Sequence, residues 1–127
     1  MLLTIFLSAS PGPDNKASHL ARQLSHENVI ALPDIDGSLD FTLAILAHAD
    51  LIISTGTAPI HMADVFDVPT IGIYPKGYTT SLSPDWAGYY HFLPVTSKSS
   101  IVYSERESDS YPVSSEAIVL AATSLLT

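Results

Sequence analysis

The 127-residue sequence contains no cysteine, which excludes disulfide bonds and thiolate metal sites. Basic residues are few, with 5 Lys and Arg against 13 Asp and Glu, and the formal net charge is −8. A surface of this sign repels nucleic acid and anionic membranes, so we predict neither as a partner. No apolar run reaches the length of a membrane span, so we predict no integral membrane segment.

Two common functional motifs are also missing. No G-x-G occurs, which removes the usual dinucleotide-binding fingerprint, and no G-x-S-x-G occurs, which removes the nucleophile elbow of hydrolases. His61 and Asp64 lie one helical turn apart, but two ligands are too few to predict a metal site. We therefore predict neither a metal nor a cofactor.

The composition is typical of a chain that buries much of itself, with 46% hydrophobic and 14% charged residues. At this length we predict a single domain over residues 1–127. Met1–Leu7 is apolar like a signal sequence, but it is short and has no basic residues, so we interpret it as the first strand. A soluble cytoplasmic protein is the default expectation.

Apolar runs alternate with segments of helical spacing along the chain. Helices are predicted after Asp14 or Asn15, after Ser38, from Pro59 and after Ser114 or Ser115. Residues 33–37 and the serine-rich, charged segment 96–112 are predicted to be exposed loops. Strands are predicted over 2–7, 28–32, 51–53, 70–74 and 91–95. This alternation predicts an α/β, Rossmann-like three-layer domain with a mostly parallel sheet.

Several apolar residues are predicted to face the core from these helices. They are Ala17, Leu20, Ala21 and Leu24 in the first helix, Leu39, Leu43, Leu46 and Ala47 in the second, Met62, Ala63 and Phe66 in the third, and Ile118, Ala121, Ala122 and Leu125 in the last.

The stretch from Ala49 to Pro75 is predicted to be the functional centre. Its continuous apolar run, Leu51–Ile53, is typical of a parallel strand covered on both faces. Small residues follow at Ser54–Thr57, and Pro59 suits the first turn of a helix. A helix start offers unpaired N–H groups and partial positive charge, so this turn can hold a phosphate. Alternatively, a threonine of the turn only caps the helix.

Three loops are expected at one edge of the sheet, where ligands of such folds bind. They are Ser8–Lys16, Ser54–Thr57 and Pro75–Trp86. The last of these is long, and loops of that length in a compact domain are usually functional or disordered.

Taken together, these residues resemble glycosyltransferase family nine, the ADP-heptose:lipopolysaccharide heptosyltransferase family, in its C-terminal half. The resemblance is carried by Ser54–Ala63, STGTAPIHMA, and by Val68–Tyr74, VPTIGIY. Pro13–Lys16 is similar to the segment that places a lysine near the donor phosphates. Ser54 departs from the family pattern, which has an aspartate there, and the spacer between Gly56 and His61 is longer than the usual one.

The resemblance implies a C-terminal half of a glycosyltransferase B fold that binds a nucleotide-diphosphate sugar. It assigns no catalytic residue to this chain, because the family's catalytic base lies in an N-terminal acceptor domain. Lys16, His61, Thr79 and Thr80 could instead have ordinary structural roles and not bind the donor. The implied donor-binding residues are Lys16, Ser54, Thr55, Gly56, Thr57, Ala58, His61, Thr79 and Thr80.

The missing first domain leaves several functions open. One is a donor-binding domain of a heptosyltransferase-like enzyme, which acts on lipopolysaccharide or a related glycan and is inactive alone. Its partners would be an acceptor domain on another chain or a second copy of this chain. The others are a degenerate Rossmann-like module for assembly or regulation and half of a nucleotide-sugar epimerase.

Overall fold

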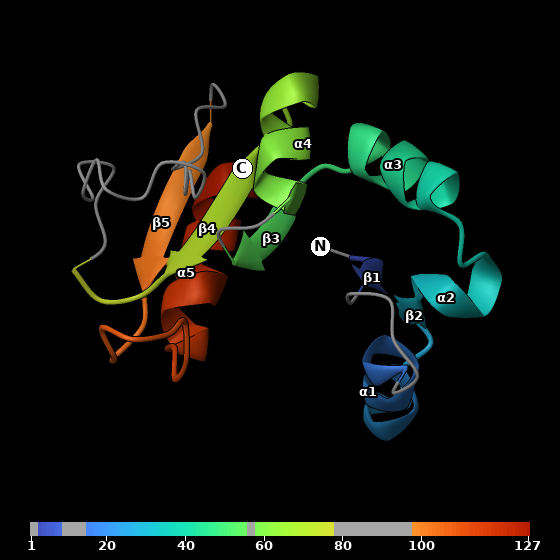
Figure 1. Ribbon diagram of the computed structural model, residues 1–127, viewed down its shortest axis with the longest axis horizontal. Coiled ribbons are helices and arrows are strands. Elements are labelled where there is room, and N and C mark those ends of the chain that lie inside the picture. The colour runs from blue at the N-terminus through green and yellow to red at the C-terminus, as the bar shows by residue number, and fades with distance from the viewer. Residues whose placement is uncertain (1–2, 9–14, 56–57, 78–97) are drawn as a thin grey trace. The chain divides into compact units, whose positions relative to one another are not determined.

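The computed structural model describes residues 3–8, 15–55, 58–77 and 98–127 (Figure 1). The elements are β1 (Ile5–Leu7), α1 (Lys16–Leu24), β2 (Val29–Ala31), α2 (Leu32–Ile35), α3 (Leu39–His48), β3 (Ile52–Thr55), α4 (Ala58–Phe66), β4 (Thr70–Tyr74), β5 (Ser99–Tyr103) and α5 (Ser115–Leu126). They fall into two compact units, Met1–Ile45 and Leu46–Thr127, each with its own parallel sheet. The protein is therefore mixed α/β with parallel strands, as the alternation of its sequence predicts.

The first unit is built on the parallel pair β1 and β2, in which Ile5 lies opposite Val29. Helix α1 contacts both strands and the short helix α2. It begins after Asn15, as predicted, but the Asn15 side chain makes no cap hydrogen bond and its backbone is left-handed, with φ of 44°. Asparagine adopts this conformation more readily than most residues. The buried Ser18 hydroxyl donates to Asp34 Oδ1 at 2.7 Å and so joins α1 to α2.

Two predictions for the first unit were wrong. Leu20 and Leu24 were expected to face inward, but both are exposed, and α1 buries Ala17 and Ser18 instead. A sheet of only two strands offers a narrow surface, so it covers a small part of the helix. Residues 33–37 were expected to form a loop, but α2 occupies most of them, with a proline in its first turn where the missing N–H costs no hydrogen bond.

Ser38 caps α3 as its sequence position predicts. Its hydroxyl accepts a hydrogen bond from the Phe41 N–H at 3.1 Å, and its own N–H donates to Asp36 Oδ1 at 2.8 Å. The N–H of Ser38, assisted by its hydroxyl, lowers the pKa of the Asp36 carboxyl. Leu39, expected on the inward face, is exposed.

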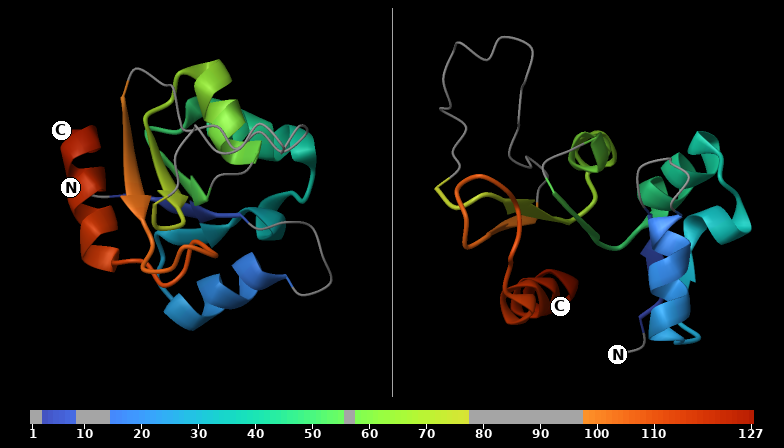
Figure 2. Two further views of the ribbon diagram at one scale, coloured as in Figure 1. Left: turned by 60° about the vertical axis from the view of Figure 1, so that its left-hand side comes forward. Right: turned by 60° about the horizontal axis from the view of Figure 1, so that its bottom comes forward.

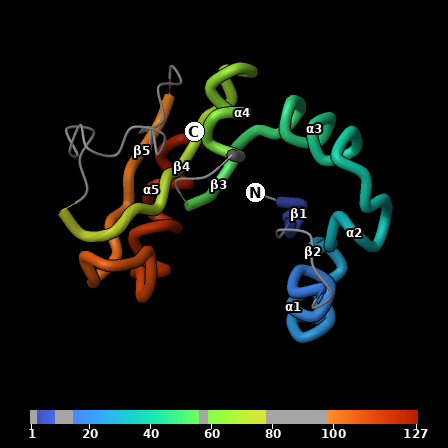
Figure 3. The backbone as a smooth tube through the Cα atoms, in the orientation of Figure 1, coloured from blue at the N-terminus to red at the C-terminus, as the bar shows by residue number. Residues whose placement is uncertain are grey.

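The second unit is built on three parallel strands in the order β3-β4-β5. Ile52 lies opposite Thr70, and Thr70 lies opposite Ser99, so all three strands start in register. The backbone returns from the end of β3 to the start of β4 through α4 (Figure 3). The carboxyl ends of the strands consequently lie together at one edge, which we call the carboxyl edge (Figure 1).

Helices α4 and α5 cover opposite faces of this sheet (Figure 2). Ile52 of β3 packs with Ala63 of α4 and with Val68, so the face that carries Ile52 is the α4 face. Helix α5 contacts β4 and β5 from the other side. The central strand β4 is therefore buried on both faces, with Ile71 wholly enclosed.

The position of β3 at the edge of its sheet explains an incorrect prediction. Leu51–Ile53 was expected to be covered on both faces, but Ile53 is exposed. It lies on the α5 face, and α5 packs over β4 and β5 instead. In α4, Ala63 is buried as predicted, whereas Phe66 is exposed and Ile60 takes its place in the core.

The last strand was also predicted incorrectly. Residues 96–112 were expected to be an exposed loop because serine and charge are frequent there, but β5 lies within them. Val102 of this strand and Ser104 just after it are buried. The strand predicted over 91–95 lies outside the described residues. Helix α5 follows the prediction, since Ser114 Oγ accepts a hydrogen bond from the Ala117 N–H at 3.2 Å.

Within the described segments, no helix combines the length and apolar character needed to cross a membrane.

The burial of α4 predicts a sharp difference between two substitutions in one helix. Ile60→Ala removes a wholly buried side chain and should lower the free energy of unfolding by about 2–5 kcal/mol. Val65→Ala changes a side chain that is 76% exposed and should alter it by less than about 0.5 kcal/mol. Urea unfolding followed by circular dichroism measures both, and equal losses would contradict this packing of α4.

Candidate site at the carboxyl edge

Strand β3 ends at the carboxyl edge, where α4 begins. Strand β3 ends at Thr55 and α4 begins at Ala58, so only two residues join them. Pro59 stands in the first turn of α4, where a missing N–H breaks no helical hydrogen bond. The first N–H groups of α4 have no partners within the helix, and the helix dipole adds positive charge there. This end of α4 has the features that suit an anion.

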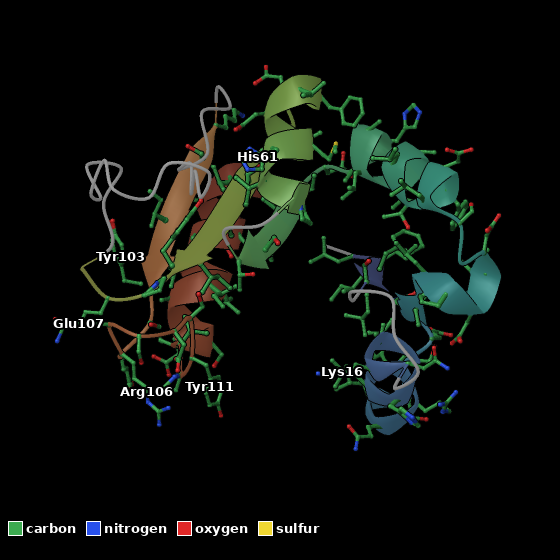
Figure 4. All side chains as sticks on the ribbon, in the orientation of Figure 1. Lys16, His61, Tyr103, Arg106, Glu107 and Tyr111 are labelled. Carbon is green, nitrogen blue, oxygen red and sulfur yellow. The ribbon has the colours of Figure 1, made fainter. Side chains whose placement is uncertain are left out.

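The described candidate residues of the second unit lie close to this connection. Ser54 is half-buried and Thr55 exposed, and they occupy the last two positions of β3. Ser54 shares the α4 face with Ile52, whereas Thr55 lies on the opposite face, because side chains alternate along a strand. His61 is exposed on the first turns of α4 (Figure 4). The structure thus brings Ser54, Thr55, Ala58 and His61 to one strand–helix junction.

The remaining candidates are placed differently. Lys16 is the first residue of α1 and is exposed, but it belongs to the first unit. The other candidates, Gly56, Thr57, Thr79 and Thr80, lie outside the described residues.

Hydrogen bonds extend the pairing of β4 and β5 beyond the ends of both strands. The Ser104 N–H donates to the Tyr74 carbonyl at 2.9 Å, and the Lys76 N–H donates to the Arg106 carbonyl at 2.8 Å. The buried Ser104 hydroxyl lies within hydrogen-bonding distance of the carbonyls of Arg106 and Asp109. These bonds fix the backbone where β4 and β5 leave the sheet, so side chains at this edge have a rigid base.

Tyr74 and Tyr103 form a pair that the sequence analysis missed. They lie opposite each other at the last positions of β4 and β5. Tyr74 is 1% exposed, and burial raises the pKa of its hydroxyl to about 12, with smaller contributions from Asp64 and Tyr103. The available signal was the run Ile101–Tyr103, because β-branched and aromatic residues favour a strand, whose last residue would reach the carboxyl edge.

The charges at the carboxyl edge differ from one strand to the next. An anion at the start of α4 would be held by backbone N–H groups and hydroxyls. Beyond β5 the chain is acidic, with Glu105, Glu107 and Asp109 against Arg106. Arg106 Nη1 lies 3.8 Å from Asp109 Oδ2, and both side chains are exposed, so this ion pair contributes little to stability. The start of α4 therefore offers positive potential, whereas the chain beyond β5 carries more acidic than basic side chains.

Comparison of the sequence with known proteins shows which protein family the chain resembles. The model of glycosyltransferase family 9 (heptosyltransferase) matches residues 3–110. A protein of Haemophilus influenzae that is provisionally named a glycosyltransferase is 39% identical over 72 residues. The aligned part is 57% of this chain and 20% of that relative, so the match spans about a fifth of the relative's length. No solved structure matches the chain significantly.

Because the Tyr74 hydroxyl is buried, we predict that the protein loses part of its stability at alkaline pH, when this hydroxyl ionises. Its pKa is raised from 10.0 to about 12 in the folded protein, so the stabilisation is complete below pH 10 and is lost as the pH rises through 12. Tyr74→Phe cannot ionise there, and its free energy of unfolding should fall less than that of the wild type between about pH 9 and about pH 11. Urea unfolding at the two pH values measures the fall.

Tyr111→Phe is the matched control for Tyr74→Phe. The Tyr111 side chain is 71% exposed, so this variant should lose stability with pH as the wild type does. Equal falls in all three proteins would show that Tyr74 ionises as freely in the folded chain as in the unfolded one.

Proposed function

Because the chain belongs to glycosyltransferase family 9, we propose that it binds a nucleotide-diphosphate sugar as the donor-binding domain of a heptosyltransferase-like enzyme. The acceptor would be lipopolysaccharide or a related surface glycan, and the transfer would take place in the cytoplasm, where nucleotide sugars are made. The whole domain, residues 1–127, would serve this single role. Its family membership supports the reaction class, and the described geometry supports the place of the donor.

One observation carries the proposal: a two-residue connection joins β3 to α4 at the carboxyl edge, inside the segment that matches the family. In parallel α/β sheets, ligands bind outside the carboxyl ends of the strands. A diphosphate at the start of α4 receives N–H donors and the positive end of the helix dipole. This explains how an acidic chain of net charge −8 can bind an anion.

The same groups would contribute to the chemical step. During transfer, the bond between the anomeric carbon and the phosphate oxygen breaks, and the electron pair leaves with the diphosphate. The acceptor hydroxyl forms the new bond from the opposite side of the sugar, with inversion, and loses its proton to a base. Negative charge grows on the diphosphate, so N–H groups and hydroxyls fixed at the turn stabilise the transition state more than the ground state.

The base that accepts this proton would come from a separate acceptor domain. Family resemblance places the base on an N-terminal domain, and we assign no catalytic residue to this chain. The acceptor domain would be a further part of a longer chain or would be supplied by another chain. Transfer activity should therefore appear only when an acceptor domain is added to the chain.

The first experiment is a calorimetric binding screen against ADP, UDP, GDP and CMP and their common sugars. Saturable binding of one nucleoside diphosphate supports the proposal and identifies the nucleobase of the donor. No response at millimolar ligand would overturn donor binding by this chain and favour a non-catalytic Rossmann-like module.

The junction after β3 predicts the effect of a branched side chain there. Gly56→Val would place bulk where the backbone must approach the diphosphate, and it should abolish nucleotide binding while the protein stays folded. Gly37→Val is the matched control, because a Cβ at Gly37 meets no atom within 4 Å and its backbone is not left-handed. Calorimetry measures binding, and circular dichroism checks the fold. Wild-type affinity in Gly56→Val would exclude the turn as the phosphate site.

Lys16 offers a second test. A lysine that contacts phosphate and a lysine that only faces solvent predict different binding affinities after substitution. Lys16→Ala should lower the affinity for a nucleoside diphosphate by roughly tenfold, since one charged contact to phosphate is lost. The affinity for the bare nucleoside should not change. Lys98→Ala is the control, because Lys98 is exposed and precedes β5 at the opposite end of the strand. Equal effects on nucleoside and diphosphate would remove Lys16 from the phosphate site.

A further inference from the structure

The aromatic pair at the carboxyl edge presents one ring to solvent. Tyr103 is 46% exposed, whereas its neighbour Tyr74 is 1% exposed. Residues opposite each other in a parallel sheet carry their side chains on the same face, and alternate residues of a strand share a face. Ile52, Thr70 and Tyr74 are related in this way, so both tyrosines lie on the α4 face. Tyr103 therefore stands at the carboxyl edge, on the same face of the sheet as α4. Figure 4 labels it at the end of β5.

The support beneath Tyr103 is rigid. Tyr74 beside it is fully enclosed, and the Ser104 N–H donates to the Tyr74 carbonyl just past the strand ends. A ring held on a fixed backbone loses little conformational entropy when it packs against a ligand. Tyr103 is thus preorganised for contact with a flat or apolar surface.

The surroundings of Tyr103 disfavour phosphate as its ligand. Glu105 and Glu107 lie two and four residues after it, and Arg106 between them is paired with Asp109. Lys76, whose N–H donates to the Arg106 carbonyl, adds one positive charge, so carboxylates outnumber basic side chains here. Carboxylates repel phosphate but accept hydrogen bonds from hydroxyl groups. An aromatic face with carboxylates beside it suits a neutral ring that bears several hydroxyls.

The distance across the sheet agrees with this chemistry. The ends of β3 and β5 are separated by two strand spacings, roughly 10 Å. A diphosphate at the end of β3 carries the sugar directly on its distal phosphate. One sugar ring, stacked on an aromatic side chain, fits the gap between that phosphate and Tyr103.

We propose that Tyr103 is the stacking surface for the sugar ring of the donor and thereby a specificity-determining residue of this site. The proposal rests on the proposed function, because it assumes a diphosphate at the β3–α4 connection. The apolar C–H face of the sugar packs on the Tyr103 ring, and its hydroxyls donate to nearby carboxylates. Tyr103 orients the anomeric carbon for transfer and takes no part in the chemistry itself.

The test compares each nucleotide sugar with its own nucleoside diphosphate by calorimetry. The probe pairs are ADP with ADP-glucose, UDP with UDP-glucose, and GDP with GDP-mannose. In Tyr103→Ala, affinity for the nucleotide sugar that binds the wild type should fall roughly tenfold, as expected for one lost aromatic contact. Affinity for the matching diphosphate should not change.

Three further variants make the result specific. Tyr103→Phe keeps the ring and should bind like the wild type, and Tyr103→Leu keeps an apolar side chain without an aromatic face and should behave like Tyr103→Ala. Tyr111→Ala removes a tyrosine that is 71% exposed on the loop after β5 and should bind normally. Circular dichroism confirms that each variant is folded.

Each other outcome overturns a definite statement. Equal losses of affinity for the diphosphate and for the nucleotide sugar would assign Tyr103 to contact with the nucleobase. Unchanged affinities for both would remove Tyr103 from the site. Either result overturns the sugar assignment alone. No binding of any probe by the wild type would overturn the proposed function and this inference together.

Discussion

Parallel pairing of β4 with a strand on each side is the constraint on which the second unit depends. Every backbone group of a central strand must be paired, and here β3 and β5 supply the partners in one register. Parallel strands require crossover connections, so a helix must link β3 to β4 and lie on one face. This requirement places the start of α4 at the carboxyl edge, next to the end of β3.

The carboxyl edge also offers an acidic protein a place for the anionic donor that we propose. Five basic residues are too few to build a cationic pocket against 13 carboxylates. Backbone N–H groups at a helix start carry positive potential without a side chain, so phosphate recognition does not depend on composition.

The position of the candidate site, between the end of a strand and the start of a helix, was indicated by the sequence. The small residues after an apolar run and the helix start behind them indicated a phosphate turn, and the structure places β3 and α4 on either side of it. Tyr103 was missed because its segment contains many serines and charges, which suggested an exposed loop. Its position beside Tyr74 arises from the β4–β5 pairing, and pairing partners distant in sequence leave no local pattern.

For the fold, the sequence by itself determined the kind and order of most elements, because periodicity, capping residues and prolines act within a few residues. Ser38 and Ser114 each cap the helix that follows, as their positions predict. Tertiary structure alone decided which apolar residues are buried. Ile53 and Leu24 have the sequence character of core residues and are exposed, because burial depends on which elements cover a given face. A local pattern specifies an apolar face, and only long-range packing supplies its partner.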